Sequence, residues 1–97
     1  MKFETAVPKA NIINLLRSCG YHFQEEKENE ISFYRSLSAL NYPRFHIYLI
    51  KRKESLVFNL HLDQKKPSYN GSPAHSAEYE GKLLKDEKER IIKILGL

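Results

Sequence analysis

Two short polar turns constrain the fold of this chain more than any other feature of its sequence. The turns at Lys27–Asn29 and Lys53–Ser55 each separate two stretches in which apolar and polar residues alternate, the pattern of half-buried strands. Strands joined by turns this short run antiparallel, because parallel neighbours require a long crossover. The sequence therefore predicts an antiparallel meander of four strands with one longer connection in its middle, formed by Tyr21–Glu26, Glu30–Leu37, Arg44–Arg52 and Leu56–Asp63.

Helical patterns flank this block of strands. A first helix is predicted to begin at Pro8, because the first helical position needs no backbone N–H, and to end before Gly20. A second helix, 82–95, carries leucine and isoleucine on about half of its wheel, and Gly81 separates it from a short helical turn that starts at Pro73. The predicted fold is α+β with the order α-β-β-β-β-α, an antiparallel meander sheet with two helices packed on one face.

The composition is that of a folded protein without a membrane span. Residues 1–97 predict a single domain, and a content of 41% hydrophobic and 29% charged residues excludes a disordered chain. The longest apolar run, Ile47–Ile50, is far shorter than the roughly 20 residues that cross a bilayer, and the N-terminus lacks the apolar segment of a signal peptide. Because Cys19 is the only cysteine, no internal disulfide forms, and we expect a cytoplasmic protein. The net charge of +4 favours anionic partners.

Alternation along the strands divides their side chains between two faces. The face toward the helices is predicted to carry the apolar set Phe33, Ile47, Leu49, Phe58 and Leu60. The opposite face then carries Tyr34, His46, Tyr48, Asn59, His61 and Asp63, framed by Arg35, Arg44, Arg52, Lys65 and Lys66. A sheet needs apolar residues on one face only, so these polar side chains are free to form a binding site. The alternative is a solvated face on which tyrosine and histidine only cover the sheet.

The polar face has the composition of a nucleic-acid-binding surface. Proteins hold single-stranded RNA or DNA with aromatic rings that stack on bases and with cations that contact phosphates. We therefore expect this chain to be a small binding module that contacts single-stranded nucleic acid through its open sheet face and the 64–78 loop. The expected contact residues are Tyr34, Arg44, His46, Tyr48, Arg52, Asn59, Lys65, Lys66 and Tyr69.

A metal or hydrolytic site is the alternative for the same region. His61 and Asp63 are two apart on a strand, so they project side by side with Cα atoms about 7 Å apart. His75 and Glu78 share a face if their segment is helical, and the 64–78 loop is expected to fold back and bring them to the first pair. Two imidazoles and two carboxylates suit a divalent metal such as zinc or manganese, or metal-free acid–base cleavage of a phosphodiester. No other cofactor is expected, and whether the chain is an enzyme stays open.

A protein-interaction module is the third hypothesis. The strand at 21–26 is predicted to form an exposed edge of the sheet, and edge strands pair readily with another chain. A homodimer formed through this edge, or through the open face, would use the same tyrosines as a nucleic-acid surface. A salt titration separates the two hypotheses, because phosphate binding weakens steeply with ionic strength and an apolar dimer barely responds.

Overall fold

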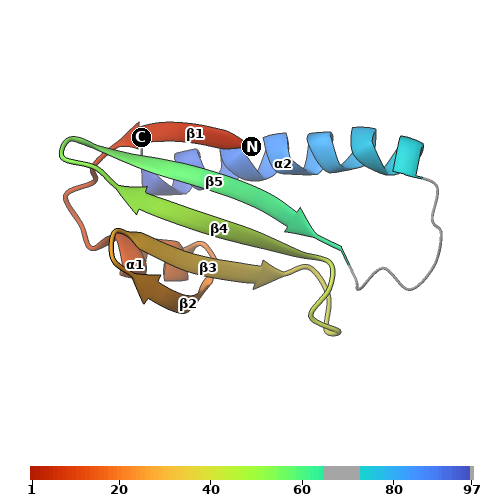
Figure 1. The fold of residues 1–97 in the computed structure, drawn as a ribbon, viewed down its shortest axis with the longest axis horizontal. Helices are drawn as coiled ribbons and strands as arrows, with labels where there is room; N and C mark the ends of the chain where they lie inside the picture. Colours follow the sequence, from red (N-terminus) through yellow and green to blue (C-terminus); the bar gives the residue numbers. More distant parts are fainter. Residues whose placement is uncertain (65–72, 97) are drawn as a thin grey trace.

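The computed structural model describes residues 1–64 and 80–96 in full and the backbone alone of 73–79. It shows an α+β architecture with a five-stranded antiparallel sheet and two helices (Figure 1). The elements in chain order are β1 (Lys2–Ala6), α1 (Ile12–Ser18), β2 (His22–Lys27), β3 (Glu30–Ser36), β4 (Arg44–Lys51), β5 (Ser55–Asp63) and α2 (Pro73–Leu95). The predicted order α-β-β-β-β-α is therefore wrong, because a strand precedes the first helix.

The sheet has the strand order β1-β5-β4-β3-β2. The meander from β2 to β5 confirms the prediction from the two short turns, and each of these strands lies close to its predicted range. The additional strand, β1, pairs with β5 and places Phe3 opposite Phe58, whose ring stacks on it at 4.8 Å. Phe3 is the one buried residue of β1, so the alternation that reveals a half-buried strand is absent from this segment.

The buried face of the sheet is the one that alternation predicted. Phe33, Ile47, Leu49, Phe58 and Leu60 are all fully buried. Cross-strand register aligns them, with Ile47 opposite both Phe33 and Leu60, so one apolar layer crosses the central strands. A shift of register by one residue would move this whole layer into solvent, and this fixes which side chains the other face presents.

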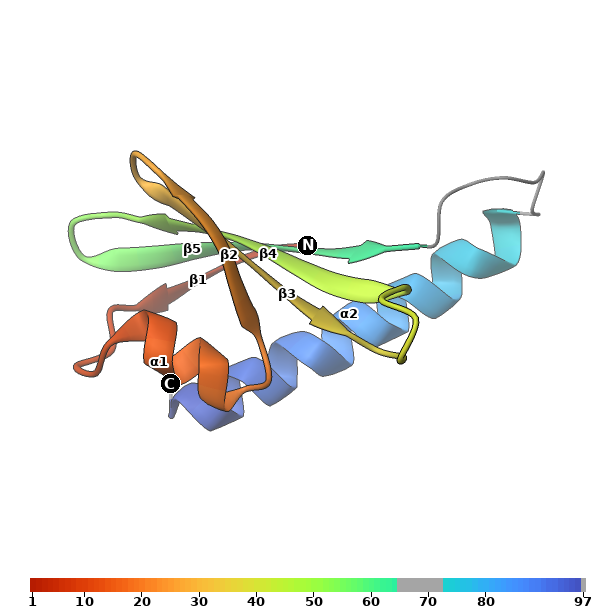
Figure 2. The same cartoon turned by 90° about the horizontal axis from the view of Figure 1, so that it is seen from below.

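The two helices contribute unequally to the fold. Helix α2 lies along the buried face of the sheet, where Ile91 and Leu95 join the core (Figure 2). Helix α1 has seven residues and packs beside β2, adding Ile12 and Leu16 to the same core. The prediction of two helices packed on one face of the sheet is therefore wrong, since only α2 packs along it. A helix of two turns is about 10 Å long and cannot span a sheet of five strands.

The helix ends also differ from their predicted positions. Helix α1 begins after Asn11, whose Oδ1 accepts the backbone N–H of Asn14 at 3.1 Å, so the start at Pro8 is wrong. Helix α2 runs unbroken through Gly81, where the predicted separation does not occur. It ends before Gly96, which has a φ of +74° and closes the helix as expected. In the part of the chain that the structure describes, neither helix combines the length and the apolar character needed to cross a membrane.

Candidate functional site

Aromatic and imidazole rings cross the sheet face opposite α2, here called the outer face. Register places His22 of β2 opposite Tyr34 of β3, Tyr34 opposite His46 of β4, and His46 opposite His61 of β5. Tyr48, two residues after His46 on β4, stacks on the His46 ring at 4.4 Å and meets the His61 ring edge-on at 5.8 Å. The rings of His22 and Tyr34 lie 5.2 Å apart. These five residues form a continuous ring row over four adjacent strands.

The ring row is part buried and part accessible. His46 is 8% exposed, whereas Tyr34 and Tyr48 are half-buried and His22 and His61 are exposed. Burial of the middle ring by its neighbours holds the row in place, and the outer rings keep surface that a planar ligand could contact. Figure 2 shows that neither helix covers this side of the sheet.

A carboxylate and an arginine adjoin the ring row where β4 begins and β5 ends. Asp63 Oδ2 accepts the Nδ1–H of His46 at 3.0 Å and lies 3.6 Å from Arg44 Nε. The Arg44 guanidinium also lies 5.0 Å from the centre of the Tyr34 ring and 4.8 Å from that of Tyr42. Arg44 is therefore held by cation–π contact with two rings, which fixes one positive charge beside the ring row.

This group, here called the Asp63 cluster (Asp63, His46 and Arg44), is incompletely hydrogen-bonded. Within the described residues, Nε of Arg44 and Nε2 of His46 are buried and have no hydrogen-bond partner. Buried polar atoms are normally paired, and each exception calls for an explanation such as a missing ligand.

A hollow of about 480 Å³ lies at the β2 end of the ring row. His22, Tyr34 and Phe23 line it together with Arg17, which comes from the last turn of α1. The hollow therefore joins a second cation to aromatic rings. Sequence reasoning missed Arg17 and His22, because their proximity depends on the docking of α1 against β2, which no local pattern encodes.

The charges on the outer face are unevenly distributed. Near the β2–β3 turn the face carries Glu25, Lys27 and Glu30, which surround a small hollow beside Tyr48. Lys27 lies 3.5 Å from Glu25 and is thereby partly neutralised. Arg44 lies at the opposite end of the strands, where it is the cross-strand partner of Ser36 on β3. Carboxylates therefore outnumber cations in the hollow near the β2–β3 turn, whereas at the other end Arg44 is paired with Asp63.

The structure brings together some of the predicted nucleic-acid contacts and separates others. Tyr34, Arg44, His46, Tyr48 and Asn59 lie close to one another on the outer face. Arg52 follows the end of β4, so the length of that strand, roughly 25 Å, separates it from Arg44 at the beginning. Arg52 instead lines a hollow with Lys2 and Glu4 near the β1 edge. Lys65, Lys66 and Tyr69 lie outside the described residues.

One predicted member of the outer face is misplaced. Arg35 points to the opposite side of the sheet, where its Nη2 donates to Glu87 Oε1 of α2 at 3.0 Å and its Nε donates to Oε2 at 3.2 Å. The prediction that Arg35 frames the open face is therefore wrong. A charged residue was expected to be exposed, but its carboxylate partner follows 52 positions later in the chain.

The Glu87 cluster (Glu87, Tyr21, Arg35 and Arg90) is a saturated network on the buried side. Tyr21 Oη donates to Glu87 Oε2 at 2.6 Å, and Arg90 donates from Nε to Oε1 at 2.8 Å and from Nη2 to Oε2 at 2.9 Å. Burial alone raises the pKa of Glu87, but hydrogen bonds from Arg90, Arg35 and Tyr21 outweigh it and lower the pKa below its ordinary value. Burial and then the charge of Glu87 raise the pKa of Tyr21. These contacts connect α2, β3 and the start of β2.

The proposed metal and acid–base residues are only partly described. His61 and Asp63 do project from β5 to the same face, but the partners of Asp63 are His46 and Arg44. His75 and Glu78 belong to the first turns of α2, and their side chains lie outside the described residues, as does the expected return of the loop. Among the side chains that are described, no group of three or more His, Cys, Asp or Glu is placed to hold a metal ion.

Comparison of the chain with family models, with curated proteins and with solved structures finds no match. Its function is therefore inferred from the geometry of the outer face alone.

Proposed function

We propose that the outer face binds single-stranded nucleic acid. The observation that carries the proposal is the ring row, in which five aromatic or imidazole rings lie on four adjacent strands beside a fixed guanidinium. Antiparallel sheets recognise single-stranded RNA in this way, by stacking two or three bases on aromatic side chains. Stacking tolerates any base, so the expected binding has little sequence preference.

The uneven charge of the outer face favours one path for the nucleic acid. Arg17 in the β2 hollow and Arg44 beside Asp63 are positioned to contact phosphates on either side of the ring row. Glu25 and Glu30 would repel a phosphate near the β2–β3 turn. We therefore place the bound strand across β2, β3, β4 and β5 along the ring row, away from that turn.

Fluorescence anisotropy with a labelled single-stranded oligonucleotide of mixed sequence tests the stacking contribution. Tyr48→Ala should weaken binding by about 1–3 kcal/mol, the range found for one base–aromatic stack, or roughly 5- to 150-fold in Kd. The matched control is Val57→Ala, which shortens another half-buried side chain of the outer face away from the ring row. Equal losses for the two variants would contradict the stacking role of Tyr48.

The salt dependence of binding tests the cations. Arg44→Gln should reduce the slope of log K against log salt by about one, because one phosphate contact is lost. Lys85→Gln removes an exposed charge from α2 and should leave the slope nearly unchanged. If the wild-type protein binds no oligonucleotide even at low salt, the proposal is wrong. Light scattering in the same buffers detects a homodimer, whose assembly through apolar contacts would not respond to salt.

The hydrolase alternative gains no specific support from the described residues. Its four groups, His61, Asp63, His75 and Glu78, are not assembled within them, and Asp63 already contacts His46 and Arg44. The ring row, in contrast, is complete as described, and we therefore prefer the binding function.

A further inference from the structure

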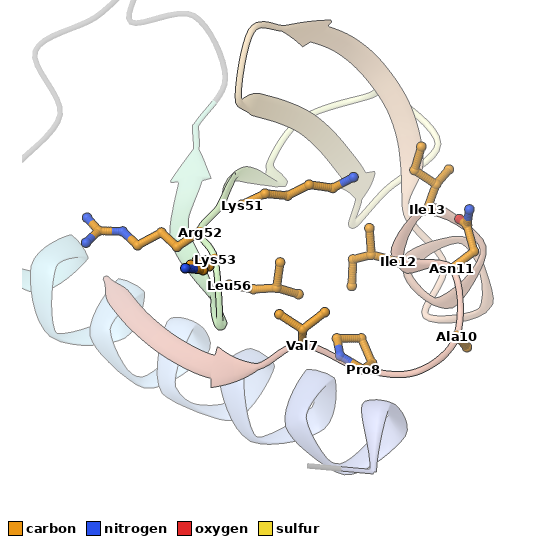
Figure 3. Close-up of a pocket in the computed structure, with 10 residues that line it drawn as sticks. All are labelled: Val7, Pro8, Ala10, Asn11, Ile12, Ile13, Lys51, Arg52, Lys53 and Leu56. Carbon is orange, nitrogen blue, oxygen red and sulfur yellow. The ribbon is translucent and has the colours of Figure 1, made fainter.

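A further cavity lies on the buried side of the sheet, at the end of β4 far from Arg44. It opens between the β1–α1 loop, the first turn of α1 and the β4–β5 turn, and has a volume of about 290 Å³ (Figure 3). Its walls are aliphatic, formed by Val7, Pro8, Ile12, Ile13 and Leu56. None of the residues that line it belongs to the ring row, so this pocket is separate from the proposed nucleic-acid surface.

The pocket lies where the first turn of α1 meets the end of β4 and the start of β5. Leu56 is buried, and its cross-strand neighbour on β4 is Lys51. Lys51 continues the inward-facing series of Ile47 and Leu49, so its side chain emerges on the core side of the sheet. Figure 3 shows Lys51 extended across the pocket in the direction of Ile12.

The cations at the mouth of the pocket are uncompensated. Among the residues that the structure describes, no carboxylate forms an ion pair with Lys51 or Lys53, including Glu54 in the same turn. Arg52 also lines the pocket, but its side chain points away from it in Figure 3. An aliphatic cavity with the Lys51 ammonium group at its mouth is complementary to a ligand that has an apolar body and an anionic head.

We propose that this pocket binds a small anionic amphiphile, a carboxylate carried on a short aliphatic chain or a single ring. The volume of about 290 Å³ lies just below the range of roughly 300–1,000 Å³ for ligand pockets, so the apolar body must be short. The pocket lacks aromatic side chains that could stack on a base, since every apolar residue lining it is aliphatic or proline. Lys51 holds the carboxylate, and Val7, Ile12 and Leu56 contact the chain.

Titration of the protein with octanoate, followed by methyl and amide NMR, tests the proposal. Saturable shifts are expected at Val7, Ile12, Ile13 and Leu56, and not at Tyr48 on the outer face. Octanol, which has the same chain without the charge, should bind at least several-fold more weakly. Lys51→Gln should weaken octanoate binding by about tenfold and bring it close to octanol, the size expected for one charge-assisted contact. Lys93→Gln, an exposed change on α2, should leave it unchanged.

Two further results decide the outcome. Val7→Trp enlarges a half-exposed side chain that faces the pocket in Figure 3 and is not part of the core, and it should abolish the octanoate shifts while the rest of the spectrum stays that of the folded protein. Shifts that spread over the whole surface, equal binding of octanol and octanoate, or no saturation below about 10 mM would overturn the proposal. Because Lys51 lies outside the ring row, Lys51→Gln should retain oligonucleotide binding, so the two proposals fail independently.

Discussion

The two faces of the sheet each carry a carboxylate surrounded by arginine and ring side chains, but the two clusters are built differently. Glu87, on the buried face, is 4% exposed and receives hydrogen bonds from Tyr21, Arg35 and Arg90. Asp63, on the outer face, has a side chain that is 34% exposed and, among the residues that the structure describes, one hydrogen-bonded partner, His46. The Glu87 cluster is saturated, whereas two buried nitrogens of the Asp63 cluster have no hydrogen-bond partner within the described part of the chain.

This difference separates a structural network from a candidate binding surface. When all acceptor positions of a buried carboxylate are filled, each hydrogen bond stabilises the folded state, and no position is left for a ligand. The partly exposed Asp63 cluster retains polar atoms that an incoming group could satisfy. Substitution should therefore affect stability at Glu87 and binding at Asp63.

The largest effect is expected for Glu87→Gln. The change leaves two guanidinium groups at the core boundary without their counter-charge, and removing one partner of a buried ion pair typically costs 3–5 kcal/mol. We expect a loss of about 3 kcal/mol in the free energy of unfolding, measured by urea denaturation. Glu89→Gln, at an exposed position of the same helix, should change it by less than about 0.5 kcal/mol. Equal effects of the two substitutions would show that the Glu87 cluster is not a stabilising network.

Acidification should remove the same stabilisation in the wild-type protein. The pKa of Glu87 is lower in the folded than in the unfolded state, so the unfolded state binds the proton first as the pH falls. The contribution of Glu87 is complete above the ordinary glutamate pKa of about 4.3 and is lost as the pH drops through the lower folded value. The difference in unfolding free energy between wild type and Glu87→Gln should be constant from pH 7 to about pH 5 and should shrink below it. A constant difference down to pH 2 would contradict this.

Most of the sheet could be predicted because its signals are local. Alternation and two short turns specify the β2–β5 meander and its buried face, including Ile47 and Leu60. Strand β1 could not be predicted, because Phe3 is its single buried residue and its partner strand begins about 50 positions later in the chain. The error about two helices on one face has another origin: α1 has only seven residues and packs beside β2 rather than along the sheet.

The outer face was predicted by the same alternation, and its errors have a different origin. Tyr34, His46 and Tyr48 are assigned to it because alternate residues of a strand point to the same face of the sheet. Arg35 was misplaced because its charge was taken to require exposure. Alternation along β3 instead points Arg35, the neighbour of Tyr34, to the buried face. A signal for its partner exists in the sequence: Glu87 stands four positions before Ile91 and so shares the buried face of α2.

A smaller effect on the Glu87 cluster is expected for Gly20→Ala. Gly20 has a φ of +95°, and an added Cβ would lie 3.1 Å from Cδ of Arg35. The substitution therefore strains the backbone and displaces an arginine that holds Glu87, at a cost of about 1 kcal/mol. Gly81→Ala is the matched control, since nothing lies within 4 Å of its added Cβ in the middle of α2. It should instead stabilise the protein by roughly 0.5–1 kcal/mol. If both substitutions shift the thermal unfolding temperature in the same direction, this account of Gly20 is contradicted.

The smallest change in stability, and the most informative change in binding, is expected for Asp63→Asn. The carboxylate is a third exposed and its ion pair with Arg44 is long, so the loss should stay below about 1 kcal/mol. Oligonucleotide affinity should rise several-fold at low salt, because the substitution removes a negative charge beside the ring row and releases Arg44 for a phosphate. Glu54→Gln removes one negative charge from the β4–β5 turn, far from Arg44, and controls for the change in net charge. A loss of stability as large as that of Glu87→Gln, with no gain in affinity, would mean that Asp63 is a structural anchor and that the two clusters do not differ in role.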